Sequence, residues 1–455
     1  MKTYTFLLAF TSLSALLSAQ VTFEHTHSNG YVISATDILE RPDGSYFYAY
    51  SNLSGWGNIG FGTLDADGIW LSESTYGTSD GYSMNMNAIQ PLANGDYMVF
   101  NDSIYCPWIV CISEKKLTRF NTDGEFMSTQ LLNLPFNSLY RDHYMNNDET
   151  VTLVSTSDVT QSRISTYTAN GDSIWSVDYA YPPGQGRIVF NAISPAANGG
   201  FMLTGKNPNG TRMLIARTNN LGDTLWLKTY GEINNVYAGI DIETIDETSF
   251  IILGDTSGIT TPSDIHLTKI DDDGNILWSK LFGGADNDFS ASILRLSDGS
   301  FVALGTTYSF GAGGSDYYLI KTDSNGNILW TNTFGTEHNE FATSIRETED
   351  GGFIISGNQE VDVFTQNIYI VKTDVMGNTV NIIHHKTIPT IYPNPTNGII
   401  QIQSNKQIIQ IEITDMAGHL VMKQFNAHDL TRLDLGKLSD GIYTITTTYN
   451  DNMKA

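Results

Sequence analysis

Residues 271–278 read DDDGNILW, and residues 323–330 repeat the pattern as DSNGNILW. Each copy places an Asp-Gly or Asn-Gly turn directly before an apolar run, a pattern typical of short β-hairpins. Related copies, some of them degraded, recur along the chain and end at residues 70, 126, 175, 226, 278, 330 and 380. A second marker, seen as DGSF at 298–301 and DGGF at 350–353, also occurs seven times, in register with the first. Two interleaved markers with a period of about 50 residues indicate a sevenfold repeat.

Each repeat contains four short apolar segments. In the sixth repeat they are residues 290–296, 301–306, 316–322 and 328–334. Tight turns join the first segment to the second and the third to the fourth, whereas longer and more variable loops make the other connections. Alternation with a period of two excludes a helical repeat. Because four short strands make one propeller blade, we expect an all-β fold: a seven-bladed β-propeller over residues 20–385.

The closure of the ring has two solutions. Residues 21–26 (VTFEHT) align with the fourth strand of a repeat, so the N-terminus can supply the outer strand of the last blade. Alternatively, residues 379–386 (TVNIIHHK) fill that place. We favour the N-terminal strand because it ties the two ends of the ring together.

Four tryptophans, Trp175, Trp226, Trp278 and Trp330, occupy the same position in four repeats. They could form a row of aromatic platforms for a ligand. A buried aromatic ring also removes 150–250 Å² of surface from water. Since each tryptophan follows a tight turn at the same spacing, we expect these rings to pack between neighbouring blades.

The N-terminal end predicts export. Residues 1–19 combine Lys2 with an apolar stretch over 6–19 that is too short to span a membrane, as in a cleaved signal peptide. No later stretch approaches 18 apolar residues, so we expect a chain that does not span the membrane. In an oxidising compartment Cys106 and Cys111 are candidates for a disulfide, with two free thiols as the alternative.

Charge divides the chain into two parts. The first 385 residues hold 18 basic and 43 acidic residues, whereas residues 386–455 hold six of each. The net charge of -25 therefore lies in the repeats. Such a field repels phosphate backbones and anionic lipids, so we expect no nucleic-acid partner.

Alternating strands and tight turns predict a small C-terminal β-sandwich over residues 386–455. These residues resemble the type A C-terminal sorting domain of the type IX secretion system. The matching positions are Tyr392, Pro393, Asn394, Pro395, Asn397, Gly398, Asp415, Gly418, Leu438, Gly441, Ile442 and Tyr443. The resemblance implies that the chain engages the type IX machinery and, after export to the periplasm, reaches the surface of a Gram-negative cell or the medium. The family normally ends with one more strand, whereas this chain ends at NDNMKA, so we expect a slightly truncated tail.

The repeats resemble secreted bacterial propellers with blades of the type DGGFIISG (350–357), IYIVKTD (368–374) and GNILWTNTFG (326–335). The activities of such proteins are mostly unassigned, so this resemblance implies an architecture and no chemistry.

Binding residues are expected on the variable loops, because the tight turns are alike in every repeat. Aromatic rings beside acids and amides would suit a polysaccharide or a protein. The candidates are Trp56, Tyr82, Tyr105, Trp108, Tyr140, His143, Tyr144, Phe190 and Phe310. We therefore expect a non-enzymatic binding module at the cell surface. The alternatives are a polymer-cleaving hydrolase or lyase, using a pair such as Asp142 with His143, and a structural surface or matrix protein.

No catalytic or cofactor motif is found, and we expect no cofactor apart from calcium as an option. Hard oxygen ligands for calcium could come from two successive repeats. The candidates are Asp286 and Asp288 in one repeat, and Glu337 and Glu340 in the next.

Overall fold

A computed structural model describes most of the repeat region and parts of the C-terminal region. The described residues are 22–27, 33–52, 58–76, 83–105, 112–132, 134, 138–146, 148–157, 161–180, 188–232, 235–258, 261–362, 365–379, 390–392, 399–403, 408–415, 420–425, 430–435, 438 and 443–449. The chain divides into two units, Met1–Val380 and Asn381–Ala455.

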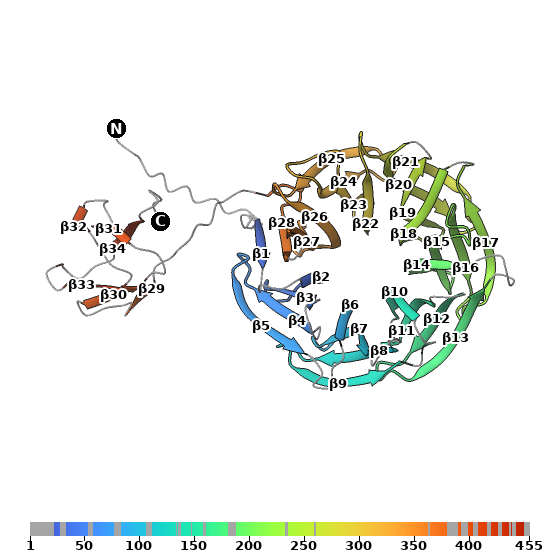
Figure 1. The fold of residues 1–455 in the computed structure, drawn as a ribbon, viewed down its shortest axis with the longest axis horizontal. Coiled ribbons are helices and arrows are strands. Elements are labelled where there is room, and N and C mark those ends of the chain that lie inside the picture. The colour runs from blue at the N-terminus through green and yellow to red at the C-terminus, as the bar shows by residue number, and fades with distance from the viewer. Residues whose placement is uncertain are drawn as a thin grey trace, which may run out of the picture. The chain divides into compact units, whose positions relative to one another are not determined.

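The first unit is a ring of seven four-stranded antiparallel sheets (Figure 1). Blades are numbered here from the one that begins with β2. The innermost strands surround the axis and are β2 (Ile33–Glu40), β6 (Ser83–Pro91), β10 (Ser138–Met145), β14 (Val189–Pro195), β18 (Asn235–Asp246), β22 (Asp288–Arg295) and β26 (Asn339–Glu347). The second strands are β3 (Tyr46–Asn52), β7 (Tyr97–Tyr105), β11 (Val151–Ser157), β15 (Phe201–Lys206), β19 (Ser249–Gly258), β23 (Phe301–Thr307) and β27 (Phe353–Asp362).

The outer half of each blade follows the same order. The third strands are β4 (Ile59–Leu64), β8 (Ile112–Phe120), β12 (Gln161–Tyr167), β16 (Met213–Thr218), β20 (Ser263–Asp271), β24 (Asp316–Thr322) and β28 (Thr365–Thr373). The outermost strands are β5 (Trp70–Tyr76), β9 (Phe126–Leu131), β13 (Ser173–Ala180), β17 (Thr224–Tyr230), β21 (Ile276–Phe282), β25 (Ile328–Phe334) and, in blade 7, β1 (Phe23–His27). The seven-bladed propeller predicted from the repeats is thereby confirmed.

The tight turns fold as their residues dictate. In the turn after β24, the Asp323 carboxylate accepts hydrogen bonds from the backbone N–H groups of Asn325 (2.8 Å) and Asn327 (2.9 Å). Between these two residues, Gly326 adopts φ = 76°, a region that favours glycine. The Asp and Gly of the marker therefore close the hairpin between the third and fourth strands.

The repeated tryptophans pack between blades, as predicted. A Cβ placed on Gly326 would lie 2.7 Å from the Trp278 ring of the preceding blade. A Cβ placed on Gly274 would lie at the same distance from the Trp226 ring. The Trp226 indole N–H also donates to the carbonyl of Asp272 in the next blade (3.1 Å). Each ring thus covers the turn glycine of its neighbour, and these tryptophans are structural.

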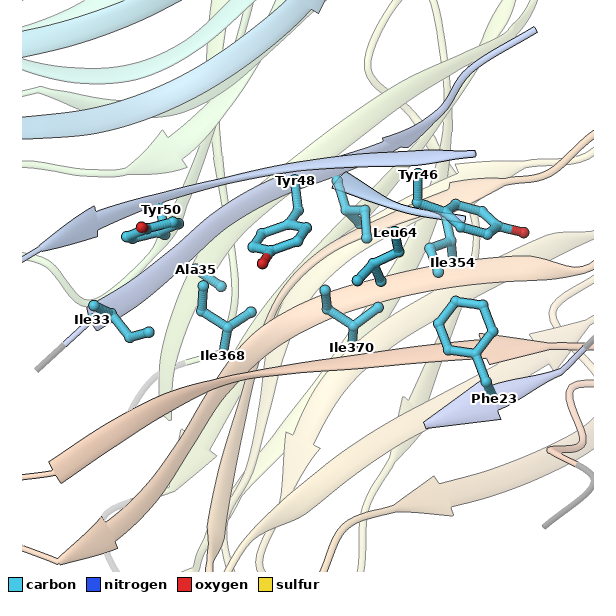
Figure 2. Close-up of a cluster of buried hydrophobic side chains, with 11 residues drawn as sticks. Phe23, Ile33, Ala35, Tyr46, Tyr48, Tyr50, Leu64, Ile354, Ile368 and Ile370 are labelled. Carbon is cyan, nitrogen blue, oxygen red and sulfur yellow. The ribbon is translucent and has the colours of Figure 1, made fainter. Parts of the chain in front are cut away.

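The N-terminal strand closes the ring. β1 pairs antiparallel with β28, from Phe23 opposite Lys372 to His27 opposite Ile368. Figure 2 shows the junction of blades 7 and 1, where Phe23 lies in the same buried cluster as Ile370. The expected closure by the N-terminus is confirmed.

The second unit contains two three-stranded antiparallel sheets, as expected for a small β-sandwich. One has the order β29 (Thr390–Tyr392), β30 (Ile399–Gln403) and β33 (Leu430–Asp434), and the other β32 (Leu420–Phe425), β31 (Ile408–Asp415) and β34 (Tyr443–Tyr449).

Candidate functional site: the central channel

Each innermost strand carries a β-bulge at the same place. A bulge leaves one residue unpaired and changes the direction of nearby side chains. The seven bulged residues are Thr36, Asn87, Arg141, Asn191, Ile240, Ala291 and Thr343. All seven line one cavity of about 1010 Å³ between the innermost strands. The bulges therefore shape a central channel.

The residue after the bulge links neighbouring blades. In blade 3 the Asp142 carboxylate accepts the backbone N–H of His143 (2.7 Å) and that of Ile193 in blade 4 (2.9 Å). In blade 5 Asp241 does the same for Ile242 (2.8 Å) and for Ile293 in blade 6 (2.9 Å). These two carboxylates hold the innermost strands of adjacent blades together.

The corresponding aspartate of blade 1, Asp37, contacts blade 7 instead of blade 2. Asp37 accepts the Ser344 hydroxyl (2.6 Å) and forms an ion pair with Arg346 (2.6 Å), both from blade 7. Asp37 thus links blade 1 to the preceding blade, whereas Asp142 and Asp241 link their blades to the following one. The Arg346 pair joins the junction of blades 7 and 1 on the channel wall.

Buried carboxyls give the channel unusual proton affinities. Burial, together with the nearby Asp241 and against the opposing effect of Arg295, raises the pKa of Glu243 to about 8. Burial likewise raises the pKa values of Asp142 and Asp241 above their ordinary range. Glu243 is therefore largely protonated at neutral pH and offers a hydroxyl donor to the channel.

His143 interrupts a repeated core position. The other six blades place isoleucine two residues after the bulge, at Ile38, Ile89, Ile193, Ile242, Ile293 and Ile345. The Gln90 side-chain NH₂ donates to the Pro91 carbonyl, so its Oε1 is free to accept the Nε2–H of His143 (3.1 Å). The other ring nitrogen of His143, Nδ1, accepts the Tyr140 hydroxyl (2.6 Å). Burial, aided by Arg346, lowers the pKa of His143 to about 4. The ring is neutral and structural at physiological pH.

Several candidate residues lie in strands rather than in loops, which corrects the sequence-based placement. Tyr140, His143 and Tyr144 belong to β10, and all three line the channel. Phe190 belongs to β14 and is 0% exposed, in contact with Tyr179 at a centroid distance of 5.3 Å. Because its ring fills the core between blades, Phe190 has no surface left for a ligand. Phe310 is 44% exposed, on the loop after β23.

The proposed dyad of Asp142 and His143 does not form. The Asp142 carboxylate contacts the backbone N–H of His143, while the imidazole bonds Tyr140 and Gln90. Neighbouring residues of a strand point to opposite faces, so the acid cannot orient the ring.

Other candidates fall outside the described residues. These are Trp56, Tyr82, Trp108, Cys106 and Cys111, the segment 1–19, and Pro393, Asn394, Pro395, Asn397, Gly398, Gly418, Gly441 and Ile442 of the sorting motif. Tyr105 ends β7, Tyr392 ends β29, Asp415 ends β31 and Tyr443 begins β34.

The calcium candidates separate into two kinds. Asp288 and Glu340 are 0% exposed at the starts of β22 and β26, whereas Asp286 and Glu337 are on the preceding loops, nearer to solvent. Among the described residues, no group of three or more His, Cys, Asp or Glu side chains could hold a metal ion. The carboxylates that face the two buried candidates were missed from the sequence and are Asp264 and Asp316.

Comparison with known proteins identifies the second unit. Residues 390–455 match the family described as the secretion system C-terminal sorting domain. The chain is thus a seven-bladed β-propeller followed by a type IX sorting domain. The sorting domain implies secretion to the cell surface or the extracellular space. Within the described ranges, no helix is long and apolar enough to cross a membrane.

The propeller is similar to several solved structures at low sequence identity. No curated protein matches the chain. One similar structure is the β-propeller domain of the Trilobed protease from Pyrococcus furiosus, 8% identical, with 79% of this chain and 100% of that chain covered and a TM-score of 0.43. The Pan2 WD40 domain from Neurospora crassa is 10% identical over 76% of this chain and 90% of that chain, with a TM-score of 0.46. A protein of unknown function from Bacteroides caccae is 12% identical over 67% of this chain and 94% of that chain, with a TM-score of 0.40.

Proposed function

We propose that this secreted propeller is a non-enzymatic module that binds a polysaccharide, and that the central channel receives the ligand. The observation that carries the proposal is the polar lining of a cavity of about 1010 Å³. Ligand sites in proteins are commonly clefts of about 300–1,000 Å³. The channel therefore has room for several sugar units of one chain.

The lining offers both hydrogen-bond donors and acceptors. The side-chain amides of Asn87 and Asn191 donate to Asp102 (3.0 Å) and to the Gly239 carbonyl (2.7 Å). These bonds fix the two Asn side chains and leave their carbonyl oxygens as acceptors. Arg295 and the protonated Glu243 add donors. Hydroxyl-rich ligands need such a mixture, since every sugar hydroxyl both donates and accepts.

A glycan array with the secreted protein tests this proposal. We expect selective binding that falls about tenfold in Arg295→Ala, because a hydrogen bond to a charged group contributes about 1.5–3 kcal/mol. Phe310→Ala serves as the control on the loop side, and it should bind within about twofold of wild type. An empty array, or binding that is lost in Phe310→Ala but kept in Arg295→Ala, would contradict the channel as the site. An empty array would favour a protein partner or a structural role.

A second candidate, glycoside hydrolysis, has one observation in its favour. Glu243 carries its proton near neutral pH, as a general acid must. A second, ionised carboxyl is required for the reaction. Asp241, which neighbours Glu243, uses its carboxylate oxygens to hold Ile242 and Ile293, so we favour binding without cleavage. New reducing ends in a bound polysaccharide, absent with Glu243→Gln, would reverse this preference.

A further inference from the structure

Two neighbouring blade junctions contain the same pair of facing carboxylates. At the junction of blades 6 and 7, Asp316 from β24 faces Glu340 from β26 across Gly335. A Cβ placed on Gly335 would lie 2.6 Å from Glu340 Oε2 and would overlap Asp316 Oδ1. The two carboxylate oxygens therefore converge on a space that exists because residue 335 has no side chain.

The junction of blades 5 and 6 repeats this arrangement with Asp264 from β20 and Asp288 from β22. A Cβ placed on Gly283 would lie 2.8 Å from Asp288 Oδ2 and would overlap Asp264 Oδ1. Both pairs lie at the face that carries the long loops, because third strands and innermost strands begin there.

In the alignment of the repeats, the complete pair occurs at these two junctions. At the junction of blades 2 and 3, Glu114 takes the place of Asp316 but the facing residue is Ser138, so only one acid is present. Asp264 and Asp316 correspond to Arg212 in blade 4, and the residue facing it at the start of the next blade is Tyr237. At the junction of blades 7 and 1, the corresponding residues are Asn367 and Ile33. Neither of these last two junctions keeps a single acid of the pair.

Each pair leaves one buried carboxylate oxygen without a hydrogen-bond partner. Asp316, 1% exposed, accepts the N–H groups of Ala312 (3.1 Å) and Gly313 (3.2 Å) through Oδ2, while Oδ1 accepts none. Asp288, 0% exposed, accepts the Gly284 N–H and the Ser309 hydroxyl, both at 2.8 Å, through Oδ2, while Oδ1 accepts none. A buried acceptor without a donor is costly, so these atoms indicate a missing ligand.

Glu340, the partner acid of Asp316, is also held by hydrogen bonds. Glu340 accepts the Thr336 hydroxyl (2.7 Å), the Gln359 amide (2.9 Å) and the Thr336 N–H (3.0 Å). No Lys or Arg among the described residues pairs with either acid. Two buried carboxylates side by side repel each other unless they share a proton or bind a cation.

We propose that the junctions between blades 5 and 6 and between blades 6 and 7 each bind a calcium ion. Carboxylate oxygens without sulfur or imidazole ligands suit a hard cation, and Ca²⁺ accepts the irregular geometry of a strand junction better than Mg²⁺. Backbone carbonyls and water complete its coordination. Each ion joins a third strand to the innermost strand of the next blade. This inference is independent of the ligand in the channel.

Calcium titration of the full-length secreted protein, first stripped with EDTA, tests the sites. We expect a rise in Tm that saturates on the order of 0.1–1 mM Ca²⁺, as in extracellular calcium modules. Isothermal titration should give two sites. The double variant Asp288→Asn/Asp316→Asn should lose both sites while its Tm in EDTA stays equal to or above that of wild type, because it removes the repulsion between the paired acids.

The matched control removes the same charge from neighbours on the loops. Asp286→Asn/Glu337→Gln should keep both sites and the full rise in Tm. The proposal is overturned if about 10 mM Ca²⁺ leaves the Tm of the wild type unchanged. It is also overturned if NaCl of equal ionic strength reproduces the rise, or if the Asp288→Asn/Asp316→Asn variant keeps it.

Discussion

At the scale of single residues, His143 shows how one exception in a repeat carries information. Six blades place isoleucine at this position, and blade 3 places a neutral histidine bonded to Tyr140 and Gln90. In the unfolded chain the pKa is near 6.5, and in the fold it is about 4. The unfolded state therefore binds more protons between these two values, so this residue lowers stability as the pH falls through that range.

Replacing His143 with isoleucine should remove this dependence. Between pH 7 and pH 4, the free energy of unfolding should fall by up to about 3 kcal/mol less in His143→Ile than in wild type. The reason is that the pKa of His143 is about 2.5 lower in the folded than in the unfolded chain. Urea unfolding at a series of pH values measures the difference. His338→Gln, at a histidine on the loop before β26, is the control. Parallel stability curves for wild type and His143→Ile would show that the ring does not resist protonation.

At the scale of elements, the tight turn and the tryptophan that covers it form one structural unit. Gly326 combines a positive φ of 76° with a Trp278 ring that would lie 2.7 Å from a Cβ at this position. Gly299 has φ = 82°, and a Cβ there would meet nothing within 4 Å. The two glycines therefore separate backbone strain from side-chain overlap.

Gly299→Ala should lower the free energy of unfolding by about 1 kcal/mol, the cost of a left-handed alanine. Gly326→Ala should lower it by about 2–4 kcal/mol, because the methyl group must also displace Trp278. Thermal or urea unfolding of the two variants gives the difference. Equal losses would mean that the tryptophan yields at no cost and does not tighten the junction.

The sequence predicts these hairpins well and the channel poorly, for a physical reason. A turn with positive φ demands Gly, Asn or Asp, so the marker is visible in the residue types. A bulge makes no such demand: Asn87, Ile240 and Ala291 have little chemistry in common. Their shared position emerges only when the innermost strands are aligned around the axis.

Tertiary packing also decides which side chains meet. Phe190 follows a Pro- and Gly-rich stretch that predicts a loop, yet its strand begins at Val189 and buries the ring. Asp264 and Asp288 are separated by a complete hairpin and face each other only because two blades pack together. A single sequence read for local pattern cannot reveal such a pair.

At the scale of the whole molecule, the ring depends on a few contacts at the junction of blades 7 and 1. Phe23 is 7% exposed, and its ring lies 5.5 Å from that of Tyr46. It also covers Gly68 at the turn of blade 1, so one side chain joins three segments.

Phe23→Ala should lower the free energy of unfolding by about 3 kcal/mol, the usual cost of truncating a buried phenylalanine. Phe310→Ala, which truncates a ring that is 44% exposed, should cost less than about 1 kcal/mol. The two Tm values by calorimetry provide the comparison. A loss in Phe23→Ala no larger than in Phe310→Ala would show that the ring holds without its N-terminal strand.

The pairing of β1 with β28 also determines the order in which the parts of the propeller fold. Phe23 is synthesised early but has no sheet to join until Lys372, its opposite residue, has been made and blade 7 has assembled. Contacts between such distant segments form slowly, because closing a long loop loses much chain entropy. The ring is therefore completed last, after nearly the whole propeller has left the ribosome.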